Sequence, residues 1–327
     1  MNTRQLGKNG YSVSEIGLGC WQFGGDFGDM PEETAMAIME TAVENGVNFF
    51  DTADVYGSGR SEFLIGEFLK LVSKDITVAT KFGRGGDTYP TGYSKDALRR
   101  AIDDSLKRLG TDSIDLLQLH CIPTEVLRKG DVFDWLRKVK EEGLIKHFGA
   151  SVETVEEGHI CLEQEGLLSL QVIFNVFRQK LVAELLPQAK EMGVGIIVRL
   201  PLASGLLAGK FTKETTFAPS DHRNYNRDGQ FFNVGETFAG LPFEVGVELA
   251  DDIKEKMLPE GLSMVKLALR WILDHEAVSV VIPGASRPEQ AKANARISDL
   301  APLPGTLHKQ LTTFYQSSVH THIRGPY

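Results

Sequence analysis

The chain has 327 residues, 42% of them hydrophobic and 24% charged, which is typical of a soluble globular protein with a large apolar core. Its formal net charge of −9 argues against a surface that binds nucleic acid or another polyanion, although local bases would still hold one anionic ligand. The three scattered cysteines, Cys20, Cys121 and Cys161, form neither a disulfide framework nor a Cys-x-x-Cys metal pair. Because no apolar run reaches membrane-spanning length and no signal segment begins the chain, we expect a cytoplasmic protein without membrane partners.

Short apolar runs recur along the whole chain. The first feature is Asn9-Gly10, a residue pair that favours a two-residue hairpin turn between two short strands. Eight apolar or β-branched runs follow, each bounded by glycine, proline or polar residues, and each predicts a strand. They cover residues 15–21, 48–54, 76–82, 114–120, 147–152, 170–176, 193–202 and 277–285.

Amphipathic helical patterns separate these runs, and several of them end at glycine, as helices commonly do. They cover residues 31–46, 61–72, 94–110, 132–143, 152–166, 181–193, 254–276 and 287–299. Eight strand–helix units in unbroken alternation predict an α/β fold, a single (β/α)8 TIM barrel domain over residues 1–327. A doubly wound sheet is the alternative, but no G-x-G-x-x-G fingerprint follows any of the strands.

One connection is much longer than the others. Residues 203–262 separate the seventh strand from its helix, and they include a helical pattern near residues 242–256. Within this connection we expect residues 212–232 to be too polar to pack against the barrel. A connection of this length inside a compact domain is usually functional, so we expect a lid or a ligand clamp.

Reactive side chains lie at the carboxyl ends of three neighbouring predicted strands. Asp51, Lys81 and His120 end the second, third and fourth strands, and Tyr56 follows on the loop after the second. In a barrel these ends form the mouth that holds the chemistry, so the four side chains should converge. A single lysine or histidine at a strand end is usually an ordinary polar residue, and a single tyrosine usually packs. Their occurrence together on adjacent strands favours a catalytic site.

These four groups suit acid catalysis on a carbonyl. A free tyrosine has a pKa near ~10, and a nearby ammonium favours its phenolate form. We therefore expect Asp51 to hold Lys81, Lys81 to lower the pKa of Tyr56, and Tyr56 to protonate an oxygen on which negative charge develops. His120 would hydrogen-bond the same oxygen and orient the carbonyl. None of these groups donates electrons, so reduction of a carbonyl needs a bound hydride cofactor.

Several segments, taken in order along the chain, resemble the aldo-keto reductases. They are LGKNGYSVSEIGLGCW, FFDTADVYGSGRSE, ATKFG, DLLQLH, IKHFGAS, PLASGLLAGKF and IPGASRPEQAKANARISD. The resemblance covers nearly the whole chain and implies a (β/α)8 barrel that binds NADPH in extended form without a Rossmann fold. It also implies a catalytic tetrad, which falls on Asp51, Tyr56, Lys81 and His120.

The resemblance further implies a set of cofactor-binding positions. They are Trp21, Asp51, Ser151, Gln171, Arg199, Leu200, Pro201, Leu202, Ser204, Gly205, Lys210, Arg223, Gly284, Ser286, Arg287, Gln290 and Asn294. This chain departs from the family pattern at Val152 and Ala293, which replace an asparagine and a glutamate, and at Arg199, which replaces a tyrosine that stacks on the nicotinamide.

Three bases near the expected adenosine end favour NADP(H) over NAD(H). Arg287 lies at the start of the last predicted helix, where backbone N–H groups already favour a phosphate, and it would neutralise a 2′-phosphate with Lys210 and Arg223. An exposed first-turn residue with no ligand is the alternative interpretation of Arg287.

For the substrate, we expect Trp21 and Phe23 to form walls of the mouth beside Tyr56 and His120. The segment after His120 offers no obvious anion trap, so the substrate should be a small neutral aldehyde, ketone or sugar. We expect no bound metal and a monomer or weak homo-oligomer. A hydrolytic barrel that uses Asp51, Asp54 and His120 is an alternative, but it leaves Lys81 unexplained. A cofactor-binding potassium-channel subunit of the same family is the other alternative; such relatives commonly lack the histidine.

Overall fold

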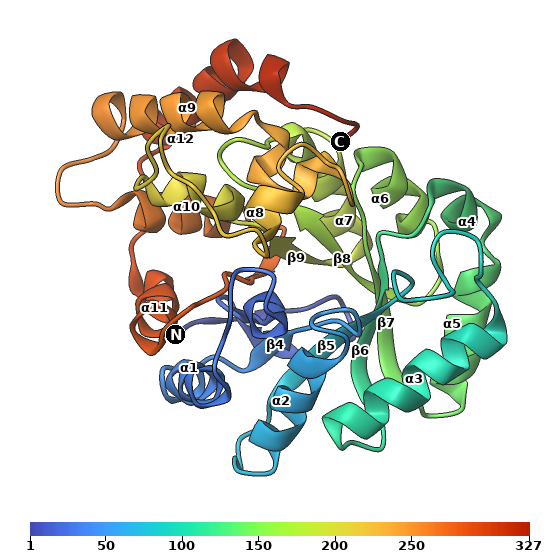
Figure 1. The fold of residues 1–327 in the computed structure, drawn as a ribbon. Coiled ribbons are helices and arrows are strands. Elements are labelled where there is room, and N and C mark those ends of the chain that lie inside the picture. Colours follow the sequence, from blue (N-terminus) through green and yellow to red (C-terminus); the bar gives the residue numbers. More distant parts are fainter.

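Eight parallel strands form the centre of the computed structural model, which describes residues 1–327 (Figure 1). They are β3 (Leu18–Gly19), β4 (Phe49–Asp51), β5 (Thr77–Phe82), β6 (Ile114–His120), β7 (Ile145–Ser151), β8 (Leu167–Ile173), β9 (Gly195–Arg199) and β10 (Val278–Val281). Each strand pairs with the next in chain order. Parallel bridges between Ile16 and Val281 and between Gly19 and Gly284 join the two edges. The predicted (β/α)8 barrel is therefore confirmed.

Helices cover the outside of the sheet, as Figure 1 shows. They are α1 (Glu32–Glu44), α2 (Arg60–Leu69), α3 (Lys95–Leu109), α4 (Thr124–Lys129), α5 (Asp131–Glu141), α6 (Val155–Leu162), α7 (Leu185–Met192), α8 (His222–Tyr225), α9 (Phe243–Lys256), α10 (Met264–Leu273), α11 (Pro288–Ala295) and α12 (Gly305–Phe314). The sequence patterns did not predict α4, α8 or α12. None of the helices is long and apolar enough to cross a bilayer.

The boundaries of α3 illustrate why the helical patterns were informative. Ser94 caps the helix by accepting a hydrogen bond from the Ala97 N–H at 3.1 Å, and Gly110 ends it with a φ of 67°. Leu98 and Ile102, four residues apart, are buried on one face. The expected seventh helix at residues 254–276 is wrong in one respect. Its first three residues end α9, and α10 begins only at Met264, after a break that contains a proline and a glycine.

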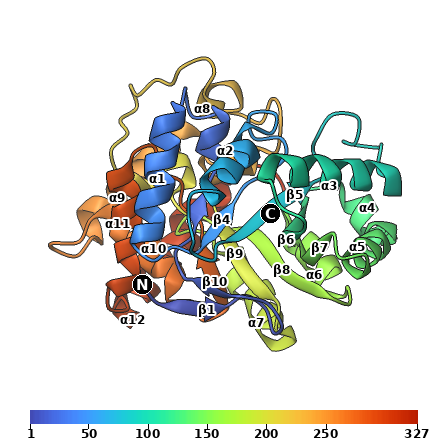
Figure 2. The ribbon, with the colours of Figure 1, turned by 90° about the horizontal axis from the view of Figure 1, so that it is seen from below.

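The N-terminal hairpin consists of β1 (Thr3–Gln5) and β2 (Ser12–Ser14), which pair antiparallel. Its connection spans residues 6–11, so the expected two-residue turn at Asn9-Gly10 is wrong. The Leu6 N–H donates to the Tyr11 carbonyl at 2.8 Å across this connection, so its tip has four residues, 7–10. Leu6 packs with Val13, Phe49 and Val280 in a buried cluster that fills the bottom of the barrel. The view from below in Figure 2 shows β1 near β10 at this end.

Part of the long connection after β9 is buried, although its polar composition predicted exposure. His222 and Asn226 are both fully buried. The side chain of Asn226 accepts hydrogen bonds from the backbone N–H groups of Phe231 and Phe232 and donates one to Thr237 at 3.0 Å. The expectation for residues 212–232 therefore holds for their first half, residues 212–220, which is mostly exposed, and is wrong for Asp221, His222 and Asn226, which are buried.

Candidate active site

Alternation along the barrel strands places charged side chains directly above the apolar layer. Side chains two residues apart on a strand point to the same face, so Asp51 follows Phe49 and Lys81 follows Ala79 on the inner side. In the register between β4 and β5, Asp51 pairs with Ala79. The apolar layer closes the barrel below, and the carboxyl ends of the strands form a polar floor above it.

Asp51, Lys81 and Tyr56 meet on this floor. The Lys81 Nζ donates to Asp51 Oδ1 at 2.6 Å and to the backbone oxygen of Thr52 at 2.7 Å. The same ammonium lies 3.4 Å from the hydroxyl oxygen of Tyr56. Lys81 and Asp51 are both buried. The lysine is thereby fixed between a carboxylate and a phenol.

Two glutamine side chains hold the other oxygen of Asp51. Gln171 donates to Oδ2 at 2.7 Å and Gln118 donates to it at 3.0 Å. Gln171 was expected among the cofactor-binding residues, whereas sequence reasoning missed Gln118. The signal was present in the strand alternation, because Gln118 lies two residues before His120 on β6. With Lys81, these donors give the buried carboxylate three hydrogen bonds.

Burial and the neighbouring charges act in opposite directions on the pKa values of Lys81 and Tyr56. Burial alone would lower the pKa of Lys81, but Asp51 and then Tyr56 outweigh it and raise that pKa above its ordinary value. Burial raises the pKa of Tyr56 to about 12, and the opposing effect of Lys81 is smaller. Lys81 thus lowers the pKa of Tyr56, as expected, but burial raises it more, so the net pKa lies above its ordinary value. The lysine limits a rise that the surrounding protein causes.

His120 lies beside Tyr56, with the two rings edge to face at 6.0 Å between centroids. Its Nδ1 is buried without a hydrogen-bond partner. Burial, followed by the charges of Arg84, Lys81 and Arg199, holds the pKa of His120 well below its usual range. The imidazole is consequently neutral at physiological pH.

A cavity of about 670 Å³ opens above these residues. Of the residues predicted for the site, those in its wall are Trp21, Asp51, Tyr56, His120, Gln171, Arg199, Leu200, Pro201, Leu202, Ser204, Gly205, Lys210, Arg223, Gly284, Ser286 and Gln290. Those that do not line it are Phe23, Lys81, Ser151, Arg287 and Asn294. Lys81 lies directly behind Tyr56. Ser151 is buried with its hydroxyl 3.5 Å from the Cys121 sulfur.

Phe23 was expected to be a wall of the mouth, and this is wrong. Its side chain is completely buried in an apolar cluster with Leu18 and Phe50. Trp21 does line the cavity; its ring stacks near Tyr56 at 5.8 Å, and its Nε1 donates to Asp26 at 2.9 Å. Sequence reasoning missed the other aromatic side chains of the cavity wall, which are Phe27, Tyr89, Phe211, Tyr225, Phe231 and Phe232.

The long connection is tied to the first barrel loop through Asp26. The Asp26 carboxylate accepts from Tyr225 at 2.8 Å as well as from Trp21, and its backbone oxygen accepts from the His222 N–H at 2.9 Å. The His222 ring lies 4.6 Å from the Trp21 ring. The connection therefore covers one side of the cavity, and its expected role as a lid or clamp stays a prediction.

Four charged side chains, which we call the charge cluster, line the cavity wall near His120: Arg84, Glu153, Arg199 and Glu236. Arg84 bridges the two acids, at 2.7 Å from Glu153 and 2.9 Å from Glu236. Arg199 lies 3.7 Å from Glu236 and donates to the backbone oxygen of Val152. Sequence reasoning missed Arg84, Glu153 and Glu236, although Arg84 and Glu153 lie just beyond the ends of β5 and β7.

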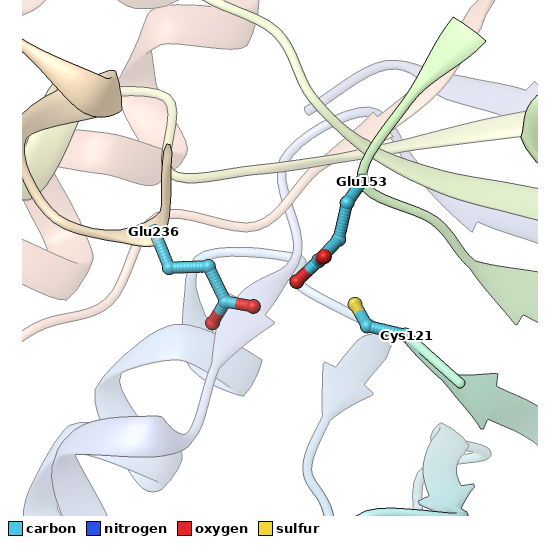
Figure 3. A group of neighbouring side chains, drawn as sticks. All are labelled: Cys121, Glu153 and Glu236. Atoms are coloured by element: carbon cyan, nitrogen blue, oxygen red, sulfur yellow. The ribbon is translucent and has the colours of Figure 1, made fainter. Parts of the chain in front are cut away.

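The sulfur of Cys121 completes this group in Figure 3, which shows the thiol and the two carboxylates pointing toward one another. Their ligand atoms lie within 4.8 Å of one another. Burial raises the pKa of the Cys121 thiol to about 11, so it stays protonated at neutral pH. A neutral thiol beside carboxylates that already pair with arginines is a poor metal ligand.

The opposite end of the cavity is formed by residues after β9 and β10. Ser204 and Gly205 both adopt left-handed backbone conformations, and a Cβ on Gly205 would approach the Phe211 ring to 2.8 Å. Gln290 accepts hydrogen bonds from the backbone and hydroxyl of Ser286. Asn294 is buried and contacts the backbone oxygen of Gly284 at 3.4 Å.

The three expected phosphate-binding bases differ in their surroundings. Arg223 is paired with Asp221 at 2.5 Å, and its guanidinium lies 4.5 Å from the Phe217 ring centre. Arg287 is 59% exposed, with Glu289 at 3.9 Å. Lys210 is exposed at the cavity rim and has no ion pair. Of the three, Arg223 is thus already neutralised.

Comparison with known proteins agrees with this architecture. The model of the Aldo/keto reductase family matches residues 15–316. An uncharacterized oxidoreductase, YqkF, of Bacillus subtilis is 31% identical, over 91% of this chain and 92% of the relative. A probable voltage-gated potassium channel subunit beta of Arabidopsis thaliana is 30% identical over 93% of each chain. The holo form of the aldo-keto reductase AKR11C1 from Bacillus halodurans superposes with a TM-score of 0.78 at 28% identity, covering 99% of this chain and 100% of that one. The chain therefore belongs to the aldo/keto reductase family.

Proposed function

We propose that this protein is an NADP(H)-dependent oxidoreductase that reduces a small aldehyde, ketone or sugar carbonyl to the alcohol, or catalyses the reverse reaction. Family membership supports an oxidoreductase that uses a nicotinamide cofactor. The observation that carries the chemical assignment is the position of the Lys81 ammonium, 2.6 Å from Asp51 and 3.4 Å from the Tyr56 hydroxyl, under a cavity that His120 also lines.

Tyr56 is the general acid in this proposal. With a pKa of about 12 its phenol is protonated at neutral pH, so a proton is available for the carbonyl oxygen. As the proton leaves, negative charge develops on the phenol oxygen, and the nearby Lys81 ammonium stabilises it. Asp51 keeps that ammonium charged and fixed in position. His120 is neutral, so it offers one N–H to the same carbonyl oxygen without repelling Lys81.

The cavity has room and polar groups for the cofactor's extended form. NADPH would supply the hydride. Gln171 and Arg199 lie beside Tyr56 where the reactive ring would bind, and the narrow turn at Ser204 and Gly205 follows along the wall. Gly284, Ser286 and Gln290 line the far end. A side chain on Gly205 would collide with Phe211, so this turn in the cavity wall requires glycine.

Preference for NADP(H) would rest on Lys210 and Arg287. Both are exposed near the far end of the cavity, and Arg287 directly precedes the N-terminus of α11. Arg223 was expected to help, but its pairing with Asp221 leaves it little charge to offer a phosphate. We therefore assign 2′-phosphate recognition to the first two bases. Ser151 and Asn294 lie behind the wall and act, if at all, by supporting it.

We further infer that residues 1–327 act as one domain in the cytoplasm, as a monomer or weak homo-oligomer. The eight strands form one ring without a second sheet that could support a separate domain, apart from the short hairpin. All three cysteines are buried and unpaired, which suits a reducing compartment.

A role as a cofactor-binding channel subunit is the second candidate, because the Arabidopsis relative carries that name. The complete group of Asp51, Tyr56, Lys81 and His120 around one cavity favours catalysis. The test is to follow the absorbance of NADPH and of NADH, separately, with a panel of aldehydes, ketones and aldoses in both directions. Turnover of a carbonyl with NADPH supports the enzyme. Negligible turnover on the whole panel, with tight NADPH binding, would favour the channel subunit.

A further inference from the structure

Lys81 has a third partner that the proton transfer described above does not use. Its ammonium carries three N–H donors, and they reach Asp51 Oδ1 at 2.6 Å, the Thr52 backbone oxygen at 2.7 Å and the Tyr56 hydroxyl at 3.4 Å. The first and third acceptors belong to side chains, which turn about their own bonds, whereas the second belongs to the main chain. The position of the ammonium beside Tyr56 therefore depends on how firmly the Thr52 peptide is held.

A chain of buried hydroxyl groups fixes the side chain of Thr52. The Thr52 hydroxyl donates to the Ser61 hydroxyl at 2.8 Å, and the Ser61 hydroxyl donates to the Cys20 backbone oxygen at 2.9 Å. Thr52 and Ser61 are both completely buried. The Cys20 N–H in turn donates to the backbone oxygen of Asp51 at 2.8 Å, which closes a ring of contacts around the Lys81 ammonium.

The loop that carries Tyr56 has a backbone that needs such support. The three residues that follow Tyr56, residues 57–59, have φ values of 59°, 54° and 93°, which are three left-handed conformations in succession. The middle one is a serine, and a side chain is strained in this region unless the surrounding structure holds it. The Ser61 N–H donates to the Tyr56 backbone oxygen at 3.3 Å. The residue whose hydroxyl meets Thr52 therefore also closes the turn of Tyr56.

Two ordinary roles for Ser61 do not account for these contacts. A serine near the start of a helix commonly caps it, but the N-cap of α2 is Gly59, and no side chain accepts a hydrogen bond there. Ligand binding is not its role either, because neither Ser61 nor Thr52 lines the cavity. The two hydroxyls instead join the segment before Trp21, the end of β4 and the start of α2, behind the cavity wall.

We propose that Thr52 and Ser61 are positioning residues of the active site, whose hydroxyl chain fixes the Thr52 oxygen that holds Lys81 and the turn that carries Tyr56. This inference rests on the proposed carbonyl reduction and adds two residues that act through the proton donor. A displacement of a catalytic group by about 1 Å lowers the rate by up to ~10²-fold. Loss of the hydroxyl chain should therefore lower kcat and leave the binding of NADPH and of the substrate intact.

The experiment separates the hydroxyl of Thr52 from the shape of its side chain. Thr52→Val keeps the branched shape and removes the donor, whereas Thr52→Ser keeps the donor and removes a methyl group. Ser61→Ala removes the link between Thr52 and Cys20. Its matched control is Ser169→Ala, because Ser169 is equally buried, on β8, and its hydroxyl makes no hydrogen bond.

The quantities measured are kcat and KM with NADPH and the carbonyl compound that the wild type reduces fastest in the panel of aldehydes, ketones and aldoses. Fluorescence titration gives the affinity for NADPH and the fraction of protein that binds it. Thr52→Val is also measured in the Tyr56→Phe background, where the group that it positions is gone. A residue that acts through Tyr56 then causes little further loss, whereas one that only supports the fold lowers the residual rate as much as in the wild type.

The kcat for reduction should fall about tenfold or more in Thr52→Val and Ser61→Ala, and by about threefold at most in Thr52→Ser and Ser169→Ala. KM and NADPH affinity should stay within about twofold of the wild type, and the loss from Thr52→Val should shrink to about twofold in the Tyr56→Phe background. Wild-type kcat in Thr52→Val, or the same loss in both backgrounds, would overturn the proposal. Failure of both Thr52→Val and Ser61→Ala to fold would also overturn it, because the hydroxyls would then support the barrel as a whole. A wild type that reduces no carbonyl would contradict the proposed function instead.

Discussion

Lys81 and Asp51 form a buried ion pair at 2.6 Å between neighbouring barrel strands, with both side chains nearly excluded from water. Taking two charges out of water is expensive, and their attraction repays the cost only while both partners are present. The additional hydrogen bonds from Gln118 and Gln171 to Asp51 complete the arrangement. The pair holds the ammonium beside Tyr56, and loss of either partner would leave the other charge buried without compensation.

Removal of one partner should destabilise the protein more than removal of both. Asp51→Asn leaves the Lys81 ammonium buried without its counter-charge, and the free energy of unfolding should fall by about 3–5 kcal/mol. The double variant Asp51→Asn with Lys81→Met should recover part of this loss. Denaturant unfolding measures both. A double variant that is less stable than Asp51→Asn alone would contradict this explanation.

The pH dependence of alcohol oxidation should reveal the raised pKa of Tyr56. Oxidation needs the phenolate as the base, and burial raises the pKa of Tyr56 to about 12, above its ordinary value near ~10. The kcat for oxidation should therefore keep rising with pH up to the limit at which the protein stays folded, whereas reduction, which needs the phenol, should not fall until that range. A plateau of the oxidation rate near pH 8 would show that the effect of Lys81 on the pKa of Tyr56 is larger than the effect of burial.

Recognition of the 2′-phosphate should depend on the two exposed bases, Lys210 and Arg287. Arg287→Ala and Lys210→Ala should each weaken NADPH binding several-fold while leaving NADH binding nearly unchanged, because NADH lacks that phosphate. Arg223→Ala is the comparison variant: its charge is neutralised by Asp221, so its effects on the two cofactors should be similar. Fluorescence titration with each cofactor gives the affinities. Equal losses for NADPH and NADH in Arg287→Ala would remove that residue from phosphate recognition.

His222 should make the protein sensitive to acid. Burial lowers the pKa of its ring to about 4, against the opposing influence of Asp221 and Asp26, while Arg223 reinforces the shift. In the unfolded chain the ring binds a proton near ~6.5, so the unfolded state gains protons first as the pH falls. This contribution to stability is complete above about pH 6.5 and is lost progressively down to about pH 4.

The measurement is the free energy of unfolding at several values of pH between 4 and 7. His222→Phe should show a shallower decline over this interval than the wild type. His322→Phe, which removes an exposed histidine near the C-terminus, should decline as the wild type does. Identical slopes for His222→Phe and the wild type would mean that another group causes the acid sensitivity.

The sequence predicted those parts of the structure that depend on local pattern. Buried strands read as apolar runs, and Asp51, Lys81 and His120 stood out because each ends such a run. The prediction that Phe23 lines the mouth was wrong because its position just after a strand end does not reveal which way its side chain points. Glu236 was not predicted because its partner Arg84 lies about 150 residues earlier in the chain. Pairings of this kind arise only when the barrel and the long connection are both folded.

The long connection shows a second limit of prediction from sequence. Its composition indicated exposure, and residues 212–220 are mostly exposed, yet Asn226 and His222 are buried. Asn226 accepts two backbone hydrogen bonds within the connection, and the His222 backbone N–H donates to Asp26 beside it. Composition indicates how many polar groups a segment carries, but it does not indicate whether these groups form hydrogen bonds within the folded protein. The pKa of Tyr56 was misjudged for a related reason, since the degree of burial around a charge is a property of the folded protein.

The most direct test of the account is the Tyr56→Phe variant, which removes the single hydroxyl that we assign as the proton donor. Reduction of the best carbonyl substrate should fall by about 10²–10⁴ in kcat, with NADPH affinity unchanged within about twofold. Tyr11→Phe, which removes a phenol far from the cavity, should retain full activity. Turnover by Tyr56→Phe equal to that of the wild type would contradict the central claim.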